Sequence, residues 1–241
     1  MADITFDTSA GSWSVGADWI GGAKPGAADA AIFDFSSGSC TLDEDSAALG
    51  TLNASMYSGT LAMGSHYIDS DGSFVWLGGT ITGDSGAKIY AEGDFVTTNG
   101  MSFDTDIEIV LDSGSGSNLI TTNSVALGAL TVNDGGGGAT FQLNGDLACG
   151  TITLASGTLD LNDKDVTLSA GSTITHNGGT LTTATDYGAT IDAGGATISG
   201  VTASKWINVT NGIDGGGNTK LAGLTSLGPP VGTLGLMGAG R

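Results

Sequence analysis

The chain has 241 residues, 43 of them glycine and only 3 proline, and its 25 acidic side chains against 6 basic ones give a formal net charge of −19. This balance argues against nucleic acid as a partner, because phosphate binding needs Lys and Arg to replace counterions, and against anionic membranes for the same reason. Collagen would need Gly at every third position and much Pro, and charge-driven disorder would need few aliphatic residues, so we predict a packed all-β protein with many tight turns.

Residues 1–40 are richer in aromatic side chains than most of the chain. Trp13, Trp19, Phe33 and Phe35 surround the turn-rich string GGAKPGAAD. The open end of a strand stack exposes unpaired backbone groups and a hydrophobic cross-section, so we predict that residues 1–40 form an N-terminal cap. The opening MADITFDTSAG lacks the basic and apolar segments of a secretory signal, which leads us to expect a protein that stays in the cytoplasm after synthesis.

The next part of the chain contains short apolar and polar alternations but no single period. The expected strand centres are Leu61, Val75, Ile81, Ile89 and Val96. Three aromatic residues lie among them, and for these we favour core or coil-edge packing over a recognition surface: Phe74, Trp76 and Tyr90.

A period is visible from residue 107 onward. Aliphatic residues recur at steps of about 22 to 24 residues, the length of one solenoid coil, through Ile107, Leu130, Ile152, Ile174, Ile198 and Leu221. Intervening pairs keep the same spacing, since Leu159 and Leu181 are one such step apart, as are Leu168 and Ile191. Coils with three short strands and three turns have this length, so we predict a parallel β-helix, or β-solenoid, of about 22–24 residues per coil over residues 41–223. A β-sandwich or jelly roll is the alternative.

The segment LTSLGPPVGTLGLMGAGR contains no acidic residue and ends on the only arginine. Gly and Pro prevent a regular helix, and the apolar residues make an unattached tail unfavourable. We therefore predict that residues 224–241 form an extended arm that docks on a neighbouring subunit, with a disordered terminus as the alternative. The expected assembly contacts are Leu227, Pro229, Pro230, Val231, Leu234, Leu236, Met237 and Arg241.

Residue patterns for catalysis or metal binding are scarce. His66 and His176 stand alone, Cys40 and Cys149 have no metal-type spacing, and GDSGA at 83–87 lacks the strand and helix that a nucleophilic serine needs. We therefore predict no catalytic, cofactor-binding or metal-binding residues, and we interpret the cysteines as buried small hydrophobic residues. Asp-rich turns offer oxygen ligands to Ca²⁺, but Asp is also favoured by turns themselves, and we prefer that interpretation for Asp69, Asp71, Asp104, Asp106, Asp160, Asp163 and Asp165.

Three stretches resemble known families. The opening GSWSVGADWIGGAKPGAADAAIFDFSSGSCTLDEDSAALGTL and the later GTITLASGTLDLNDKDVTLS resemble bacterial surface β-helix proteins, including autotransporter-type repeats. The stretch WINVTNGIDGGGNT at 206–219 is similar to phage structural proteins. These resemblances imply a surface, stacking or attachment role and carry over no catalytic residue.

We therefore expect a non-enzymatic virion protein, specifically a capsid decoration protein on the exterior of a phage head. It would assemble in the host cytoplasm as a homo-oligomer, most simply a trimer, and dock on the major capsid protein or another virion protein. A bacterial surface adhesin or glycan-binding β-helix is the alternative. A tailspike-like polysaccharide depolymerase is the second alternative, because paired carboxylates on a β-helix suit glycoside cleavage. Flat threonine ladders would favour a solenoid that binds ice or polysaccharide.

Overall fold

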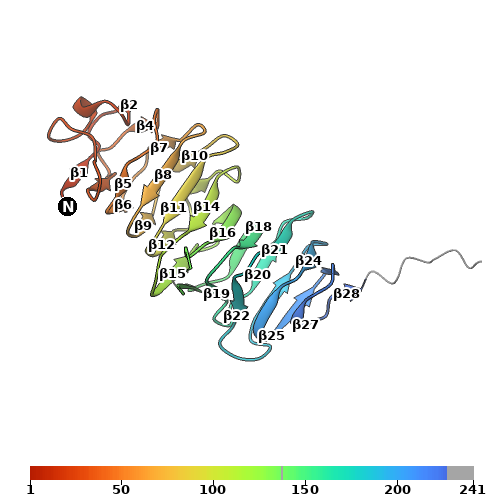
Figure 1. The fold of residues 1–241 in the computed structure, drawn as a ribbon. Coiled ribbons are helices and arrows are strands. Elements are labelled where there is room, and N and C mark those ends of the chain that lie inside the picture. The colour runs from red at the N-terminus through yellow and green to blue at the C-terminus, as the bar shows by residue number, and fades with distance from the viewer. Residues whose placement is uncertain (137, 227–241) are drawn as a thin grey trace, which may run out of the picture.

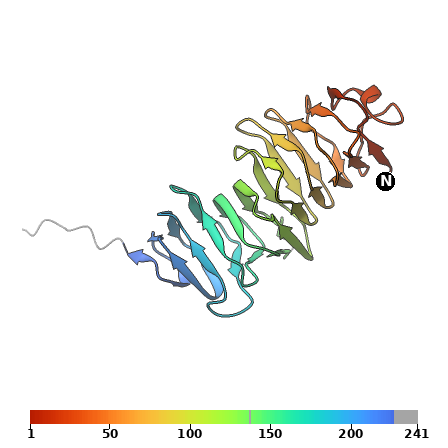
Figure 2. The ribbon, with the colours of Figure 1, turned by 180° about the vertical axis from the view of Figure 1, so that it is seen from behind.

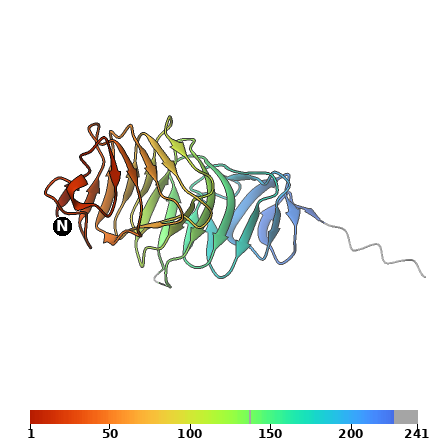
Figure 3. The ribbon, with the colours of Figure 1, turned by 90° about the horizontal axis from the view of Figure 1, so that it is seen from above.

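The computed structural model describes residues 1–136 and 138–226 as a nearly all-β rod (Figure 1). The chain winds through about nine turns of a β-solenoid whose strands pair in parallel with the coils before and after them. The N-terminus lies at one end of the rod and the last described strand at the other (Figure 2), and from above the coils follow one axis (Figure 3). The prediction of a parallel β-solenoid is confirmed, and the alternative of a sandwich is wrong.

Each coil contributes strands to three faces, met in the order first, second, third. The first face contains β1 (Asp3–Thr5), β3 (Ala30–Ile32), β6 (Thr51–Ala54), β9 (Phe74–Trp76), β12 (Phe95–Thr97), β15 (Ser117–Thr121), β17 (Thr140–Leu143), β19 (Thr158–Asp160), β22 (Thr180–Thr182) and the start of β25 (Thr202–Thr210). The second face begins with β2 (Ala10–Ser12), β4 (Ser39–Thr41), β7 (Thr60–Ala62), β10 (Thr80–Thr82) and β13 (Ser102–Phe103). It continues with the first halves of β16 (Ala126–Val132) and β18 (Leu147–Leu154), then β20 (Val166–Leu168), β23 (Thr190–Asp192), the end of β25 and β27 (Thr219–Ala222).

The third face completes each coil before the chain returns to the first. It contains β5 (Ala48–Leu49), β8 (Tyr67–Ser70), β11 (Lys88–Ala91), β14 (Glu108–Leu111), the second halves of β16 and β18, β21 (Thr173–His176), β24 (Thr197–Ser199), β26 (Ile213–Asp214) and β28 (Thr225–Ser226). One short 3₁₀ helix, η1 (Gly16–Asp18), lies in the N-terminal loop. Among the described residues, no helix has the length and apolar character needed to span a membrane.

The predicted aliphatic ladder forms the interior of the rod. Leu130 pairs with Ile152, Ile152 with Ile174, and Ile174 with Ile198, and all four side chains are buried. On the first face, Leu159 pairs with Leu181, as their spacing in the sequence predicted. Stacked strands lie about 4.8 Å apart, so each coil covers the apolar row of the next.

Some positions in the predicted ladder are wrong. Ile109, not Ile107, pairs with Leu130, because Ile107 is buried at the turn before β14. Ile191 pairs with Val166, so Leu168 lies one inward position away from the predicted match. At the end of the rod the coils shorten: Ile198 pairs with Asp214, and Leu221 pairs with Ile207 instead.

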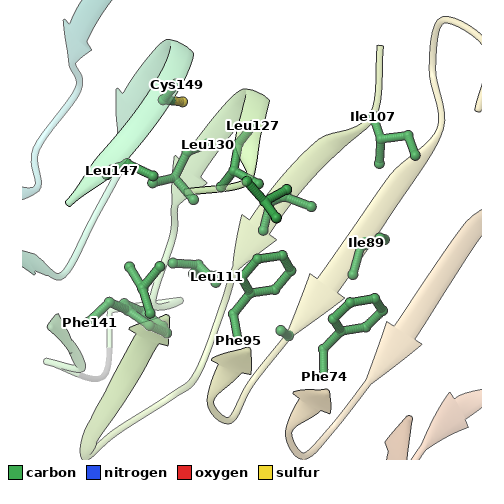
Figure 4. Packing of buried hydrophobic residues seen from close by; sticks show 14 of the residues in the cluster. Phe74, Ile89, Phe95, Ile107, Leu111, Leu127, Leu130, Phe141, Leu147 and Cys149 are labelled. Atoms are coloured by element: carbon green, nitrogen blue, oxygen red, sulfur yellow. The ribbon is translucent and has the colours of Figure 1, made fainter. Parts of the chain in front are cut away.

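The first half of the rod is as regular as the second, although its sequence shows no obvious period. Leu61 pairs with Ile81 on the second face, and Phe74 pairs with Phe95 on the first. Both phenylalanine rings are buried and stacked, with centroids 5.3 Å apart (Figure 4). The buried positions of Phe74 and Trp76 confirm the core interpretation for these two residues. Tyr90 is only half-buried and packs edge-on against Tyr67 of the preceding coil, outside the core.

An aromatic cluster fills the N-terminal end of the rod. Trp19 packs edge-on against Phe6 at 5.1 Å and against Trp13 at 5.0 Å, and Phe33 lies 5.7 Å from Trp19. Phe35 departs from the prediction, because it lies on a turn outside the core and 74% of it is exposed. Since β4 pairs with both β2 and β7, strand pairing continues across residue 40, and the limits of the cap remain a prediction.

Candidate functional site

The predicted assembly contacts Leu227, Pro229, Pro230, Val231, Leu234, Leu236, Met237 and Arg241 lie outside the described residues. Residues 224–226 are described, and within them Thr225 and Ser226 form the last strand, β28. The docking role of the 224–241 arm therefore stays a prediction.

The histidines and cysteines occupy separate places on the rod. The Nδ1 atom of His66 lies 3.1 Å from a carboxylate oxygen of Asp45, and Nε2 of His176 contacts the backbone oxygen of Gly179. Cys40 and Cys149 are both buried and unpaired, which confirms their interpretation as small core residues. Burial raises the pKa of each thiol to about 12, which disfavours the reactive thiolate form in the folded protein.

Four of the seven aspartates predicted at turns accept hydrogen bonds from backbone amides of the described residues. Asp104 accepts a hydrogen bond from the Asp106 backbone at 3.1 Å, Asp160 accepts one from Asn162 at 2.9 Å, and Asp165 accepts one from Thr190 at 2.8 Å. The bonds of Asp104 and Asp160, each to the residue two positions on, confirm their interpretation as turn residues. The bond of Asp165 joins the next coil instead, and Asp69 departs from the prediction because it lies within β8. In the part of the chain that the structure describes, no group of three or more His, Cys, Asp or Glu side chains is arranged to hold a metal ion.

An acidic row follows the corner where the third face meets the first. The backbone amides of Asp71, Glu92 and Asp112 donate to the coil before them, at Leu49, Ser70 and Ala91. The three residues therefore hold equivalent positions in successive coils. We call Asp71, Glu92 and Asp112, with Asp69 on the adjacent strand, the acidic row.

The acidic row is electrostatically unfavourable. Burial, followed by repulsion from Glu92 and Asp69, raises the pKa of Asp112 to about 6. Burial and the charges of Asp71 and Asp69 also raise the pKa of Glu92, and burial with Asp71 raises that of Asp69. The Oδ1 atom of Asp112 is buried without a hydrogen-bond partner within the described residues, although the side chain as a whole is partly exposed.

A groove of about 640 Å³ runs along another corner, between the second and third faces. Asp43, His66, Asp84 and Asp104 contribute its polar lining. Asp43 is already engaged, because its carboxylate accepts hydrogen bonds from the Ser14 backbone at 3.0 Å and hydroxyl at 2.6 Å, and the hydroxyl bond lowers the pKa of Asp43. The groove is therefore an open polar trough in which two of the acids, Asp43 and Asp104, already hold backbone groups.

The outer surface of the third face changes along the rod. In the N-terminal coils its outward positions include Asp69, Lys88 and Glu108. In the C-terminal coils they form hydroxyl columns, in which Thr173 stacks on Thr197 and Thr175 on Ser199. These stacked pairs are a partial counterpart of the flat threonine ladders expected of an ice-binding or polysaccharide-binding solenoid, and a hollow of about 370 Å³ lies over them.

A pair of exposed aromatic rings interrupts the polar surface of the C-terminal coils. Tyr187 lies in the loop between β22 and β23, Trp206 lies within β25, and their rings stack with centroids 6.0 Å apart and planes 11° apart. The two residues are 52% and 40% exposed. Their separation along the chain hides the pairing in the sequence, but the register of Ile191 with Val209 places the two segments side by side.

No protein-family model matches the chain, and searches of curated proteins and of solved structures found no match.

Proposed function

We propose that the chain is a non-enzymatic structural protein of a bacteriophage particle, which decorates the exterior of the head as a trimeric rod. The observation that carries the proposal is the continuous buried ladder through about nine turns. A solenoid in which every coil covers its neighbour is a stiff body of fixed length, which suits a part that is repeated over a shell.

The charge of the surface supports an outward position on the particle. A formal charge of −19 on 241 residues keeps such rods soluble and apart from one another, and it discourages edge-to-edge strand pairing. The segment of residues 224–241 carries no acid, and in this proposal it binds the major capsid protein or another virion protein.

The test is co-sedimentation with gradient-purified particles, followed by mass spectrometry. We expect the full chain to travel with the particles and a chain lacking residues 224–241 to be lost from them. A matched variant with Leu234→Ser, Leu236→Ser and Met237→Ser keeps the length of the arm and should also be lost, because it removes apolar contacts. Recovery of the full chain only in a secreted fraction would instead favour the adhesin alternative, and release of reducing ends from a polysaccharide would overturn the non-enzymatic assignment.

A further inference from the structure

The loop that carries Tyr187 is fixed by bonds between coils. The carboxylate of Asp163 accepts hydrogen bonds from the hydroxyl of Thr183 at 2.8 Å and from both the backbone and hydroxyl of Thr185, at 2.8 and 2.9 Å. These bonds, first that from the Thr185 backbone, lower the pKa of Asp163 and keep it ionised. The segment swings out beyond β22 (Figure 1), yet it is held at its base.

The backbone of Trp206 is bonded to the same loop on both sides. Its amide donates to the Asp186 carboxylate at 2.8 Å, and its carbonyl accepts from the Tyr187 amide at 2.7 Å. Backbone bonding therefore holds the two segments side by side, and the rings stack on each other from these fixed positions. Such preorganisation reduces the ordering cost of binding a ligand.

Tyr187 adopts an unfavourable backbone conformation. Its φ angle is +63°, in the left-handed region that bulky side chains avoid. Glycine would adopt this angle without a steric cost, so the folding of the loop does not require a tyrosine here. Strain of this kind is concentrated at functional positions, and the exposed ring is the feature that glycine would lose.

The surroundings indicate the chemistry of the ligand. Trp206 and Tyr187 are the only large hydrophobic residues exposed beyond Leu119 in the described part of the chain, so the apolar area is far smaller than the roughly 1,000 Å² that a stable protein interface needs. Hydroxyl and amide groups lie on the same coils: Thr182 bonds to Ser204, and the Asn208 amide donates to the Tyr187 carbonyl at 3.4 Å. Aromatic surface beside many hydrogen-bonding groups is suited to a small amphipathic ligand.

The charge of the coils around the pair is negative, like that of the whole protein. Lys205 donates to the Ala184 carbonyl and Lys220 to the Ser204 carbonyl, so two of the six basic residues lie on these coils. With Lys164 they are the three basic residues of the stretch 158–222, which also carries six acids and so has a formal charge of −3: Asp160, Asp163, Asp165, Asp186, Asp192 and Asp214. An anionic ligand is therefore disfavoured here as on the rest of the protein, whereas a neutral ligand meets no such repulsion.

We propose that Tyr187 and Trp206 form a binding platform for a neutral saccharide, with the apolar face of a sugar ring against the aromatic rings and its hydroxyls bonded to the neighbouring polar groups. This proposal does not depend on a virion location, since a saccharide platform would serve equally on a particle or on a cell surface.

The first experiment uses the fluorescence of the intact protein. Trp13, Trp19 and Trp76 are no more than 2% exposed, so Trp206 is the tryptophan that acrylamide can reach. The probes are maltoheptaose, cellopentaose, chitopentaose and mannopentaose, with an oligogalacturonate as the anionic comparison. We expect at least one neutral probe to protect Trp206 from quenching. Protection by none of the neutral probes, or by the anionic probe alone, would overturn the proposal.

The second experiment separates a binding role from a structural one. Calorimetry should show at least tenfold weaker binding of the protecting saccharide by Trp206→Ala and by Tyr187→Gly, while Tyr187→Gly keeps or raises the melting temperature because it relieves the left-handed φ. Tyr67→Ala is the matched control, since Tyr67 is 37% exposed and packs edge-on against Tyr90 at 5.7 Å on another face. Unchanged binding by both platform variants, or an equal loss in the control, would overturn the proposal.

Discussion

Replacing Asp112 by asparagine should stabilise the protein at neutral pH. The pKa of Asp112 is raised from 3.8 to about 6, because burial and the neighbouring acids disfavour its charged form. At about 1.4 kcal/mol per tenfold change in proton affinity this corresponds to about 3 kcal/mol, and screening by water at a partly exposed group reduces it to about 1 to 2 kcal/mol. An asparagine side chain carries no charge, so we expect Asp112→Asn to gain that amount at pH 7.

The pH dependence gives the sign of the effect. The pKa of Asp112 is higher in the folded than in the unfolded protein, so the folded state binds more protons at pH values between the two pKa values. The contribution of Asp112 to the free energy of unfolding therefore falls as the pH rises from about 4 to about 6, and it stays constant above about pH 6. Urea unfolding between pH 3.5 and 8 should show a smaller fall for Asp112→Asn than for wild type. Asp106→Asn is the control, because it removes one exposed charge outside the acidic row. The reasoning is refuted if Asp112→Asn is no more stable than Asp106→Asn at pH 7.

Three further predictions concern the core and the corners of the coil. Phe95→Ala should lower the free energy of unfolding in urea by about 3 to 5 kcal/mol, because the Phe95 ring is fully buried against Phe74. Val96→Ala, on the partly exposed side of the strand, should lower it by less than about 1 kcal/mol. Equal losses in the two variants would contradict the inward ladder. Gly128→Ala should prevent normal folding, since a Cβ atom at this position would lie 1.6 Å from the Thr105 carbonyl oxygen. Gly114→Ala should change the free energy of unfolding by about 0.5 kcal/mol or less, because a Cβ atom there would meet nothing within 4 Å. Circular dichroism and thermal melting of both variants test the contrast. Cys40 and Cys149 should react with a thiol reagent only after denaturation, and rapid labelling at pH 8 in the absence of denaturant would show that the core is open.

The sequence was most informative where the inward positions are aliphatic. Ile152, Ile174 and Ile198 stand one coil apart, and because their turns differ little in length the period is visible. In the first half the inward positions include Ser70 and Thr97 as well as aromatic residues, so no single residue type repeats. Stacking needs only that a side chain fill its layer, and this is why a regular structure had an irregular sequence.

The surface features depend on register that spacing alone did not supply. Asp71, Glu92 and Asp112 follow one another at nearly equal intervals, and an acidic period of one coil was a usable signal. The Tyr187–Trp206 pair was harder to find, because the loop before β23 is long and the next coil is short. Phe35 shows the same difficulty at the other end, since a turn carries it out of the core.

Spin-label distances along the third face test the central claim, a rod of parallel coils in register. Tyr67 pairs with Lys88, Lys88 with Glu108, Glu108 with Ala129 and Ala129 with Thr151, and Thr173 and Thr197 follow in the next two coils. Tyr67→Cys combined in turn with Thr151→Cys, Thr173→Cys and Thr197→Cys should give distances of about 19, 24 and 29 Å, which grow by about 4.8 Å per coil. The buried native cysteines leave the engineered ones as the labelled sites. Distances that fail to increase in equal steps would contradict the stacked solenoid.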